Sequence, residues 1–599
     1  MTQVKSSYQD RLTALRAAMR DVGVNGYIIP RADEFQGEFV ASYAERLKWL
    51  TGFTGSGGAA LVLEDTAFAL TDGRYTLQIR EQTDPALFET GDYIKKPLAQ
   101  WVAAHAPENA VIGYDPWLHT PSQIEKISGH VAAKNIILKA IEKNLIDRVW
   151  KNRPKKPKGQ VTGFPVDVAG KTCGEKRMMI AEKIRNKGGD AAIITMPDSI
   201  SWLLNVRGAD VDCIPYVLSY ALVDRGGYVS WFVDPRKVPL DFHLYEGVRI
   251  IPLPEMKKYL ERFALEAERP ILIDSTRTPI WFNNCLKRGG AIVKNFDDPC
   301  VAIKARKTQA EQNAIKTAHI ADGVALVKFL KWLEGAAPKG KLTEISVTKK
   351  LHAFRALHPA FKGNSFPTIA GFGANGAIIH YRADEKTNAS IAGNGLLLID
   401  SGGQYAGEHY GTPCYGTTDI TRTVAIGAPT QDMRESFTRV LKGHIALAAA
   451  QFPLGTLGAQ IDTLARKPLW DAGLDYAHGT GHGVGCYLGV HEDAANISSR
   501  GQKPLQPGML LSNEPGYYKE NEYGIRIENL VFVRKSGEAS LCFETISFAP
   551  IDTNLIIAEM LSDKKRAWMN AYHAAVFENL SPHLNLQDKN WLQSKTRAI

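Results

Sequence analysis

The sequence of 599 residues predicts a multidomain α/β protein, in which two similar α/β domains precede a larger α+β domain. Amphipathic helices alternate with short apolar strands through the first half, which is typical of layered α/β domains. A Lys/Pro-rich stretch at residues 151–158 interrupts this pattern, as a linker does. A second break falls near Asp298 and Pro299. The predicted domains are residues 1–152, 153–303 and 304–599.

The first two predicted domains look like variants of one unit. In the first, an amphipathic helix over residues 11–20 precedes apolar strands over 26–30 and 59–63. In the second, a helix over 176–186 precedes a strand over 191–195. The shared order of elements indicates two domains of one kind, although the similarity is weak by itself.

The third predicted domain opens with a capping box. Thr308 and Glu311 have the spacing of an N-cap and its reciprocal partner, and they start a helix that runs to residue 333. A buried strand follows over residues 396–399, and a second helix over 433–452 is closed by Pro453. Near the end, apolar and charged residues alternate, which predicts a strand with Arg526 and Glu528 on one face.

Composition narrows the functional class. The net charge of +9 is modest for this length and much of it lies in the 151–158 linker, so no nucleic-acid partner is expected. No apolar stretch reaches the roughly 20 residues of a membrane span, and residues 1–20 lack the apolar core of a secretion signal. Seven scattered cysteines without a C-x-x-C pair favour reduced thiols and therefore a cytoplasmic protein.

Five residues in the C-terminal third suggest a metal site. Taken singly, each has an ordinary explanation, such as a turn for Asp400 or a solvent-facing strand position for Glu528. Together they are four carboxylates and one imidazole, and carboxylates cannot be buried side by side without positive charge. Two divalent cations would supply it, and oxygen-rich ligands with one nitrogen suit Mn²⁺, with Co²⁺ or Zn²⁺ as alternatives. The sequence therefore predicts a hydrolytic site that holds two metal ions. Its predicted ligands are Asp400, Asp419, His482, Glu514 and Glu528.

The segments around these residues carry a family resemblance. The chain resembles the Xaa-Pro aminopeptidases (aminopeptidase P) of the long, three-domain cytosolic type. The resemblance implies two creatinase-like N-terminal domains and a catalytic domain of the pita-bread fold. It extends into the N-terminal half, at residues 52–58, 71–75 and 202–208. The matching C-terminal segments are 376–381 (GAIIHY), 398–405 (LIDSGGQY), 416–423 (GTTDITRT), 478–485 (HGTGHGVG), 490–492 (VHE), 513–518 (NEPGYY) and 524–529 (GIRIEN).

The resemblance also implies roles for individual residues. Asp400 would hold one metal, Asp419 and Glu528 would bridge two, and His482 and Glu514 would hold the second. Glu514 would in addition accept the proton of the attacking water. The implied substrates are peptides with proline in the second position, and the implied assembly is a homodimer. The residues implied to contact substrate or developing charge are His380, His478, His491 and Arg526, and those that could line a proline pocket are Tyr381, Tyr517 and Tyr518.

One stretch departs from the family pattern. Asp400 and Asp419 are 19 positions apart, about eight more than in the family, and an even insertion can lengthen both arms of a hairpin without changing its register. We therefore expect a strand ending at Asp400, a turn, and a second strand carrying Asp419. The added residues form a surface loop in the simplest interpretation. His409 as an extra ligand, or displacement of one aspartate from the metals, are the alternatives.

Other functions stay open on the sequence alone. Prolidase shares the five ligands, but the length of this chain favours the aminopeptidase. A catalytically inactive peptide-binding module is the alternative from another class, and all five ligands argue against it. Creatinase-type C–N hydrolysis is disfavoured because that enzyme lacks the metal ligands.

Overall fold

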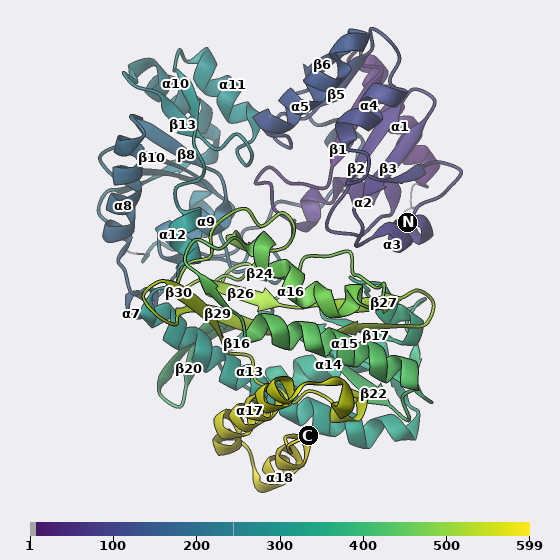
Figure 1. Ribbon diagram of the computed structural model, residues 1–599. Coiled ribbons are helices and arrows are strands. Elements are labelled where there is room, and N and C mark those ends of the chain that lie inside the picture. The colour runs from purple at the N-terminus through teal and green to yellow at the C-terminus, as the bar shows by residue number, and fades with distance from the viewer. Residues whose placement is uncertain (1–6, 243–244) are drawn as a thin grey trace. The chain divides into compact units, whose positions relative to one another are not determined.

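The computed structural model describes residues 7–242 and 245–599 and divides them into two compact units (Figure 1). Within these residues, unit 1 holds 7–164, 171–212, 216–242 and 245–300, and unit 2 holds 165–170, 213–215 and 301–599.

Unit 1 contains two six-stranded sheets that follow one plan. In the first, the inner strand β1 pairs antiparallel with β2 and parallel with β5. In the second, β8 likewise pairs antiparallel with β10 and parallel with β13. The first sheet has the order β4 (Glu89–Asp92), β3 (Ala67–Thr71), β2 (Ala59–Leu63), β1 (Gly26–Pro30), β5 (Val111–Tyr114), β6 (Ile137–Ala140). The second has the order β12 (Val248–Pro252), β11 (Val229–Val233), β10 (Tyr220–Asp224), β8 (Ala191–Ile194), β13 (Ile271–Ile273), β14 (Val293–Asn295).

The repeated plan confirms two α/β modules of one kind in the first half of the chain. The predicted helices at 11–20 and 176–186 are present as α1 and α8, each with a reciprocal capping box at its N-terminus. The predicted boundary at residues 152–153 stays a prediction, as does the boundary at 303–304. The helices of this unit are α1 (Tyr8–Asp21), α2 (Arg46–Thr51), α3 (Thr76–Gln82), α4 (Leu98–His105), α5 (Pro121–Val131), α6 (Leu145–Val149), α8 (Cys173–Asn186), α9 (Pro197–Leu203), α10 (Met256–Glu266) and α11 (Ile280–Arg288).

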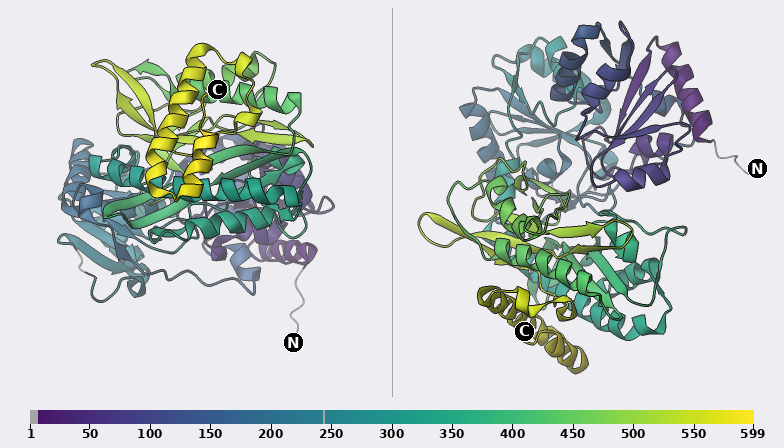
Figure 2. Two further views of the ribbon diagram at one scale, coloured as in Figure 1. Left: turned by 90° about the horizontal axis from the view of Figure 1, so that it is seen from below. Right: turned by 45° about the vertical axis from the view of Figure 1, so that its right-hand side comes forward.

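Unit 2 is a mixed α+β domain built around antiparallel sheets. The capping box of Thr308 and Glu311 opens α13 as predicted. The C-terminal helices α17 and α18 pack beside α13 (Figure 2). The helices are α7 (Val166–Ala169), α12 (Val301–Ala305), α13 (Gln309–Ala336), α14 (Glu344–Arg355), α15 (Gln431–Ala448), α16 (Gly458–Trp470), α17 (Asp563–Leu580) and α18 (Leu586–Lys595).

Three sheets of unit 2 carry the segments of interest. A three-stranded sheet has the order β17 (Ile369–Phe372), β19 (Gly395–Ser401), β22 (Ile420–Ile426). A second has the order β16 (Phe361–Asn364), β20 (Gly403–His409), β21 (Thr412–Thr417). A six-stranded sheet has the order β23 (Gln451–Pro453), β30 (Ser540–Thr545), β29 (Asn529–Lys535), β26 (Leu510–Asn513), β24 (Gly481–Gly483), β25 (Glu492–Ile497). A separate pair is formed by β27 (Gly516–Lys519) and β28 (Tyr523–Arg526).

Two sequence predictions were wrong in detail. The helix expected to reach residue 452 ends at Ala448, because residues 451–453 leave it and pair with β30 around the buried Phe452. The strand expected to carry both Arg526 and Glu528 is interrupted: β28 ends at Arg526 and β29 begins at Asn529. A helix spanning a bilayer is not found among the residues that the structure describes.

The insertion forms a β-ribbon. β20 and β21 pair without interruption from Gln404–Thr417 to His409–Thr412, so the even insertion lengthens both arms as predicted. Tyr410 and Gly411 make the turn, and both have positive φ, as the common two-residue hairpin turn requires.

The base of the ribbon is packed and its tip is exposed. Cys414 is fully buried in a cluster with Ala318, Ala360 and Tyr405, so the insertion is more than a surface loop. At the tip, His409 hydrogen-bonds His358 at 2.8 Å, a contact outside the predicted ligand set.

Helices α15 and α16 pack against each other and on the strands of the six-stranded sheet (Figure 1). They approach closely at Gly443, where an added Cβ would lie 2.1 Å from the Ala465 carbonyl oxygen. No side chain fits at this distance, so the glycine sets the separation of the two helices.

We predict that Gly443→Ala lowers the free energy of unfolding by about 1–3 kcal/mol, because the helices must move apart. Gly335→Ala on α13 is the matched control, since nothing lies within 4 Å of its Cβ position; it should raise stability by up to about 1 kcal/mol. Urea unfolding followed by circular dichroism measures both. Unchanged stability in Gly443→Ala would contradict the close approach.

Candidate metal centre

The five predicted ligands come together in unit 2 from five separate segments. Asp400 stands near the end of β19, and the pairing of β19 with β22 places it opposite Thr421. Asp419 lies in the break between β21 and β22 rather than in a strand, which corrects the expectation that a second strand carries it. His482 is the central residue of β24, Glu514 follows β26, and Glu528 lies between β28 and β29.

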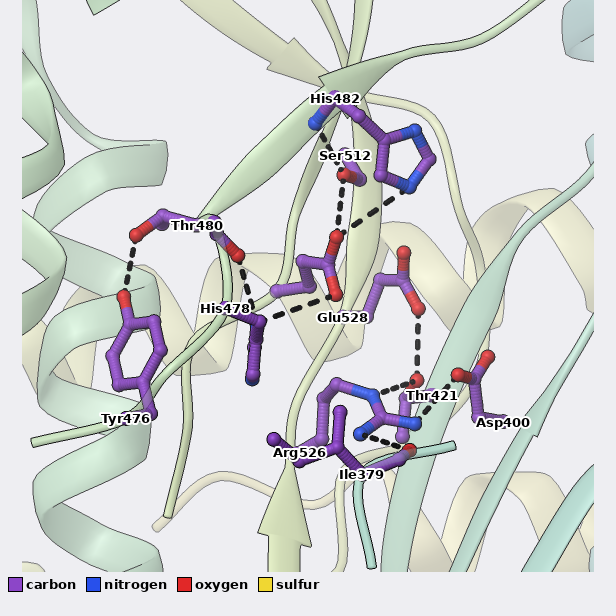
Figure 3. A network of polar contacts seen from close by, with 12 residues as sticks. Ile379, Asp400, Thr421, Tyr476, His478, Thr480, His482, Ser512, Arg526 and Glu528 are labelled. Carbon is purple, nitrogen blue, oxygen red and sulfur yellow. Dashed lines mark hydrogen bonds and ion pairs between the residues drawn. The ribbon is translucent and has the colours of Figure 1, made fainter. Parts of the chain in front are cut away.

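The ligand atoms converge. His482 Nε2 lies 3.5 Å from Asp419 Oδ2 and 3.4 Å from Glu514 Oε1. One ligand atom each of Asp419, His482 and Glu528 all lie within 4.8 Å of one another, close enough to surround a single cation. Figure 3 shows Glu528 between His482 on one side and Arg526 with Asp400 on the other. The insertion between the aspartates therefore displaces neither of them from the group.

His482 presents the correct nitrogen to this space. Its Nδ1 lies 3.0 Å from the Gly483 carbonyl oxygen, which can only accept a hydrogen bond. Nδ1 thus carries the proton, and Nε2 directs a lone pair toward Asp419 and Glu514. This is how histidine ligands are commonly oriented, with the other ring nitrogen donating to a carbonyl.

Asp400, Asp419 and Glu528 are buried, and Glu514 beside them is partly buried, with its side chain 17% exposed. Burial raises the pKa values of Asp419, Glu514 and Glu528, and their neighbouring carboxylates raise those of Asp419 and Glu528 further. Asp400 Oδ1 is buried and has no hydrogen-bond partner among the described residues. An unpartnered buried oxygen beside three other acids suits a hard metal ion as its partner.

Arg526 pairs with Asp400 and not with Glu528. Its Nη2 donates to Asp400 Oδ2 at 2.6 Å, and its Nη1 donates to the Tyr518 hydroxyl at 2.6 Å. The guanidinium is 2% exposed. Glu528 instead accepts a hydrogen bond from the Thr421 hydroxyl at 2.8 Å, and that hydroxyl accepts one from Arg526 Nε at 3.2 Å. The predicted substrate-binding role of Arg526 stays a prediction.

Two of the three further histidines, His478 and His491, contact ligand residues of the centre, and the predicted substrate-contacting roles of all three stay predictions. His478 donates from Nδ1 to the Gly479 carbonyl and accepts at Nε2 from the Tyr518 hydroxyl, each at 2.8 Å. Burial raises the pKa of Tyr518 to about 12, so this hydroxyl keeps its proton. The ring of His491 stands edge-on to that of His482 with centroids 4.4 Å apart. His380 is half-buried and follows Ile379, whose carbonyl oxygen lies 3.5 Å from Arg526 Nη1.

The tyrosines divide. Tyr518 reaches the centre through Arg526 and His478. Tyr381 donates instead to Glu344 at 2.7 Å. A role for Tyr381, Tyr517 or Tyr518 in a proline pocket stays a prediction.

Sequence reasoning missed several side chains that hold the ligands. The Ser512 hydroxyl donates to Glu514 Oε1 at 3.2 Å and accepts from the backbone N–H of His482 at 2.9 Å. Arg422 donates to the Glu528 carbonyl oxygen at 2.7 Å. Polar residues within otherwise apolar strands were the available signal, since a fully buried Ser, Thr or Arg requires a partner.

A buried charge cluster anchors the strand beside His482. Glu492 pairs with Gly483 between β25 and β24, and its carboxylate accepts from Lys304 at 2.7 Å and also from Lys307. All three side chains are at most 3% exposed. The cluster therefore fixes the backbone next to both His482 and His491.

Family models cover most of the chain. The model for metallopeptidase family M24 matches residues 313–535, and the model for the C-terminal region of these peptidases matches 539–599. Two models for the creatinase/prolidase N-terminal domain match residues 11–146 and 152–311.

Individual relatives are similar over their whole length. Aminopeptidase P2 of Arabidopsis thaliana is 36% identical over 100% of this chain and 89% of its own. A probable Xaa-Pro aminopeptidase P of Aspergillus niger is 36% identical over 98% of both chains.

Comparison with solved structures points to the same group of enzymes. The crystal structure of X-prolyl aminopeptidase from Caenorhabditis elegans, described as a cytosolic enzyme with a di-nuclear active site, superposes with a TM-score of 0.92 at 31% identity, covering 99% of this chain and 100% of the other. The prolidase of Pyrococcus horikoshii covers 63% of this chain and 99% of its own with a TM-score of 0.50 at 24% identity, a likeness of fold alone. The chain therefore belongs to the aminopeptidase P family of Xaa-Pro aminopeptidases, within metallopeptidase family M24.

Proposed function

We propose that this protein is a Xaa-Pro aminopeptidase, a metal-dependent hydrolase that releases the first residue from peptides with proline in the second position. The observation that carries the proposal is the convergence of Asp419, Glu514 and Glu528 on His482. The full-length similarity to aminopeptidases P supports the substrate class.

The centre takes two divalent metal ions. Asp400, Asp419, Glu528, His482 and Glu514 are the side chains that would hold them. When bound, such ions would lower the pKa of water so that hydroxide is available near neutral pH. Mn²⁺ is our proposed metal, because a set of four carboxylates and one imidazole is richer in hard oxygen ligands than most zinc sites.

The chain's own residues account for the proton transfers. Glu514 Oε1 is held by Ser512, while Oε2 lies 3.9 Å from His478 Nδ1 and accepts no hydrogen bond from Ser512. Oε2 is therefore the oxygen placed to take a proton from the attacking water. When the bond before proline breaks, the proline nitrogen needs a proton, and Glu514 returns the one that it accepted.

The histidines around the centre would bind the substrate. His380, His478 and His491 would border the scissile carbonyl in this proposal, because positioned donors stabilise the charge that develops on that oxygen. Asp400, which Arg526 orients, would receive the free α-amine together with the metal. This requirement for an N-terminus makes the enzyme an exopeptidase.

A cytoplasmic homodimer is the assembly that we propose. The cytoplasmic location is supported by the seven cysteines, all of which are free thiols, and by the likeness to a structure described as cytosolic. The homodimer rests on the family resemblance.

We predict that the purified protein, supplied with Mn²⁺, releases arginine from Arg-Pro-Pro. Chromatography of the products measures the release. Arg-Pro, a dipeptide, should be cleaved much more slowly, which separates this activity from that of a prolidase. Folded, Mn²⁺-supplied protein that leaves the tripeptide intact would rule out the proposed function.

We predict that Asp419→Ala and His482→Ala each lower kcat/KM by more than about 100-fold, since losing even a hydrogen-bond partner of a metal ligand typically costs 10–100-fold. Circular dichroism should show an unchanged fold. His352→Ala, which replaces an exposed histidine of α14, is the control and should keep full activity. Substantial turnover in either ligand variant would remove that residue from the ligand set.

We predict that the tip of the inserted ribbon is dispensable for catalysis. Replacing residues 408–413 by an Asn-Gly turn keeps Gly407 opposite Cys414 and retains the buried base, so kcat/KM should stay within about twofold. Kinetics with Arg-Pro-Pro measure the effect. A large loss in a folded variant would instead assign the tip a part in substrate binding.

A further inference from the structure

Glu514 and Glu528 depend on one pair of asparagines. Asn513, the last residue of β26, is paired in register with Asn529, the first residue of β29. Glu514 follows the first asparagine and Glu528 precedes the second. The two glutamates therefore leave the same end of one strand pair, and the geometry of that pair sets the distance between them.

His444 of α15 bridges the two asparagines. Its Nδ1 lies 3.1 Å from the Asn513 carbonyl oxygen, and its Nε2 lies 3.1 Å from Asn529 Nδ2. The Asn513 side chain in turn donates from Nδ2 to the His444 carbonyl oxygen at 2.9 Å. The imidazole and both asparagines have no exposed surface.

The hydrogen bonds of this group have a single consistent direction. Asn529 Oδ1 accepts from Arg422 Nη2 at 2.9 Å and from the Tyr572 hydroxyl at 3.2 Å, so its Nδ2 is the atom that faces His444. His444 Nε2 must then accept, and Nδ1 donates to the Asn513 carbonyl. Burial, aided by the charge of Arg422, lowers the pKa of His444 to about 3. The ring is thus neutral near neutral pH and lies between the two asparagines.

We propose that His444 is a positioning residue of the metal centre, which holds Glu514 and Glu528 at the separation that two metal ions require by clamping Asn513 to Asn529. The inference rests on the proposed function, because it takes these glutamates as ligands. His444 itself touches neither metal nor substrate. It acts through the backbone of one glutamate segment and the neighbouring side chain of the other.

A purely structural role is separable from this one, because the same unit contains a second buried histidine. His573 is fully buried, and its Nε2 accepts from the backbone N–H of Ile551 at 3.1 Å. Replacing His573 also removes a hydrogen bond to buried backbone. Among the described residues, however, His573 contacts neither Asn513 nor Asn529. His573→Phe is therefore the matched control for His444→Phe.

The test is a calorimetric titration of the metal-free full-length protein with Mn²⁺, beside thermal unfolding of the same samples. His444→Phe keeps the ring and loses both polar contacts, and its affinity for Mn²⁺ should fall by about 10–100-fold. The His444→Asn variant can keep the hydrogen bond made by Nδ1, and the His444→Gln variant can keep the one made by Nε2. Each should therefore lose less affinity for Mn²⁺ than His444→Phe. His573→Phe should lower thermal stability and leave the affinity unchanged.

Each outcome of this test either supports or overturns the inference. Wild-type protein that binds no Mn²⁺ overturns the proposed function and, with it, this inference. Normal wild-type binding with all three His444 variants within twofold of it overturns the inference alone. So does an equal loss of affinity in His573→Phe. If His444→Phe does not fold, His444→Asn and His444→Gln carry the comparison, and a severalfold loss in both supports the clamp.

Discussion

Unit 2 holds four carboxylates within reach of one another although their charges repel. The rest of its structure depends on withstanding this repulsion. Arg526 offsets part of this charge at Asp400, and burial still raises the pKa values of Asp419, Glu514 and Glu528. Such a group is unfavourable in an empty protein and favourable around cations. The surrounding fold therefore has to hold the acids in place against a force that would separate them.

It does so by placing the ligands where strands end or break. Asp400, Asp419, Glu514 and Glu528 stand near the end of a strand or in a short break between two, while β19 with β22 and β26 with β29 pair in continuous register. Buried polar side chains then fix each exit: Thr421 and Arg422 at Glu528, Ser512 at Glu514, and the Glu492 cluster beside His482. The ligands are positioned by rigid sheets, and little is left to mobile loops.

The sequence predicted the parts of this arrangement that local patterns determine. The capping box at Thr308, the strands at 26–30 and 59–63, and the even ribbon were predictable because each depends on nearby residues. The helix end at Ala448 and the break at Glu528 were not predictable, because both involve partners that are distant in sequence. Residues 451–453 pair with β30 and do not continue the helix, and Glu528 accepts a hydrogen bond from Thr421. His444 lay beyond prediction for the same reason, since its partners are about 70 and 85 residues away.

The ribbon between the two aspartates has a consequence for how this protein can vary. Because β20 and β21 pair in continuous register from base to turn, residues added two at a time extend the ribbon outward and leave its base as it was. A single added residue has to be absorbed as a bulge or a wider turn. The ribbon can therefore change in length by two residues at a time without disturbing its base. Its tip is a place to graft a tag or a binding epitope away from the metal centre.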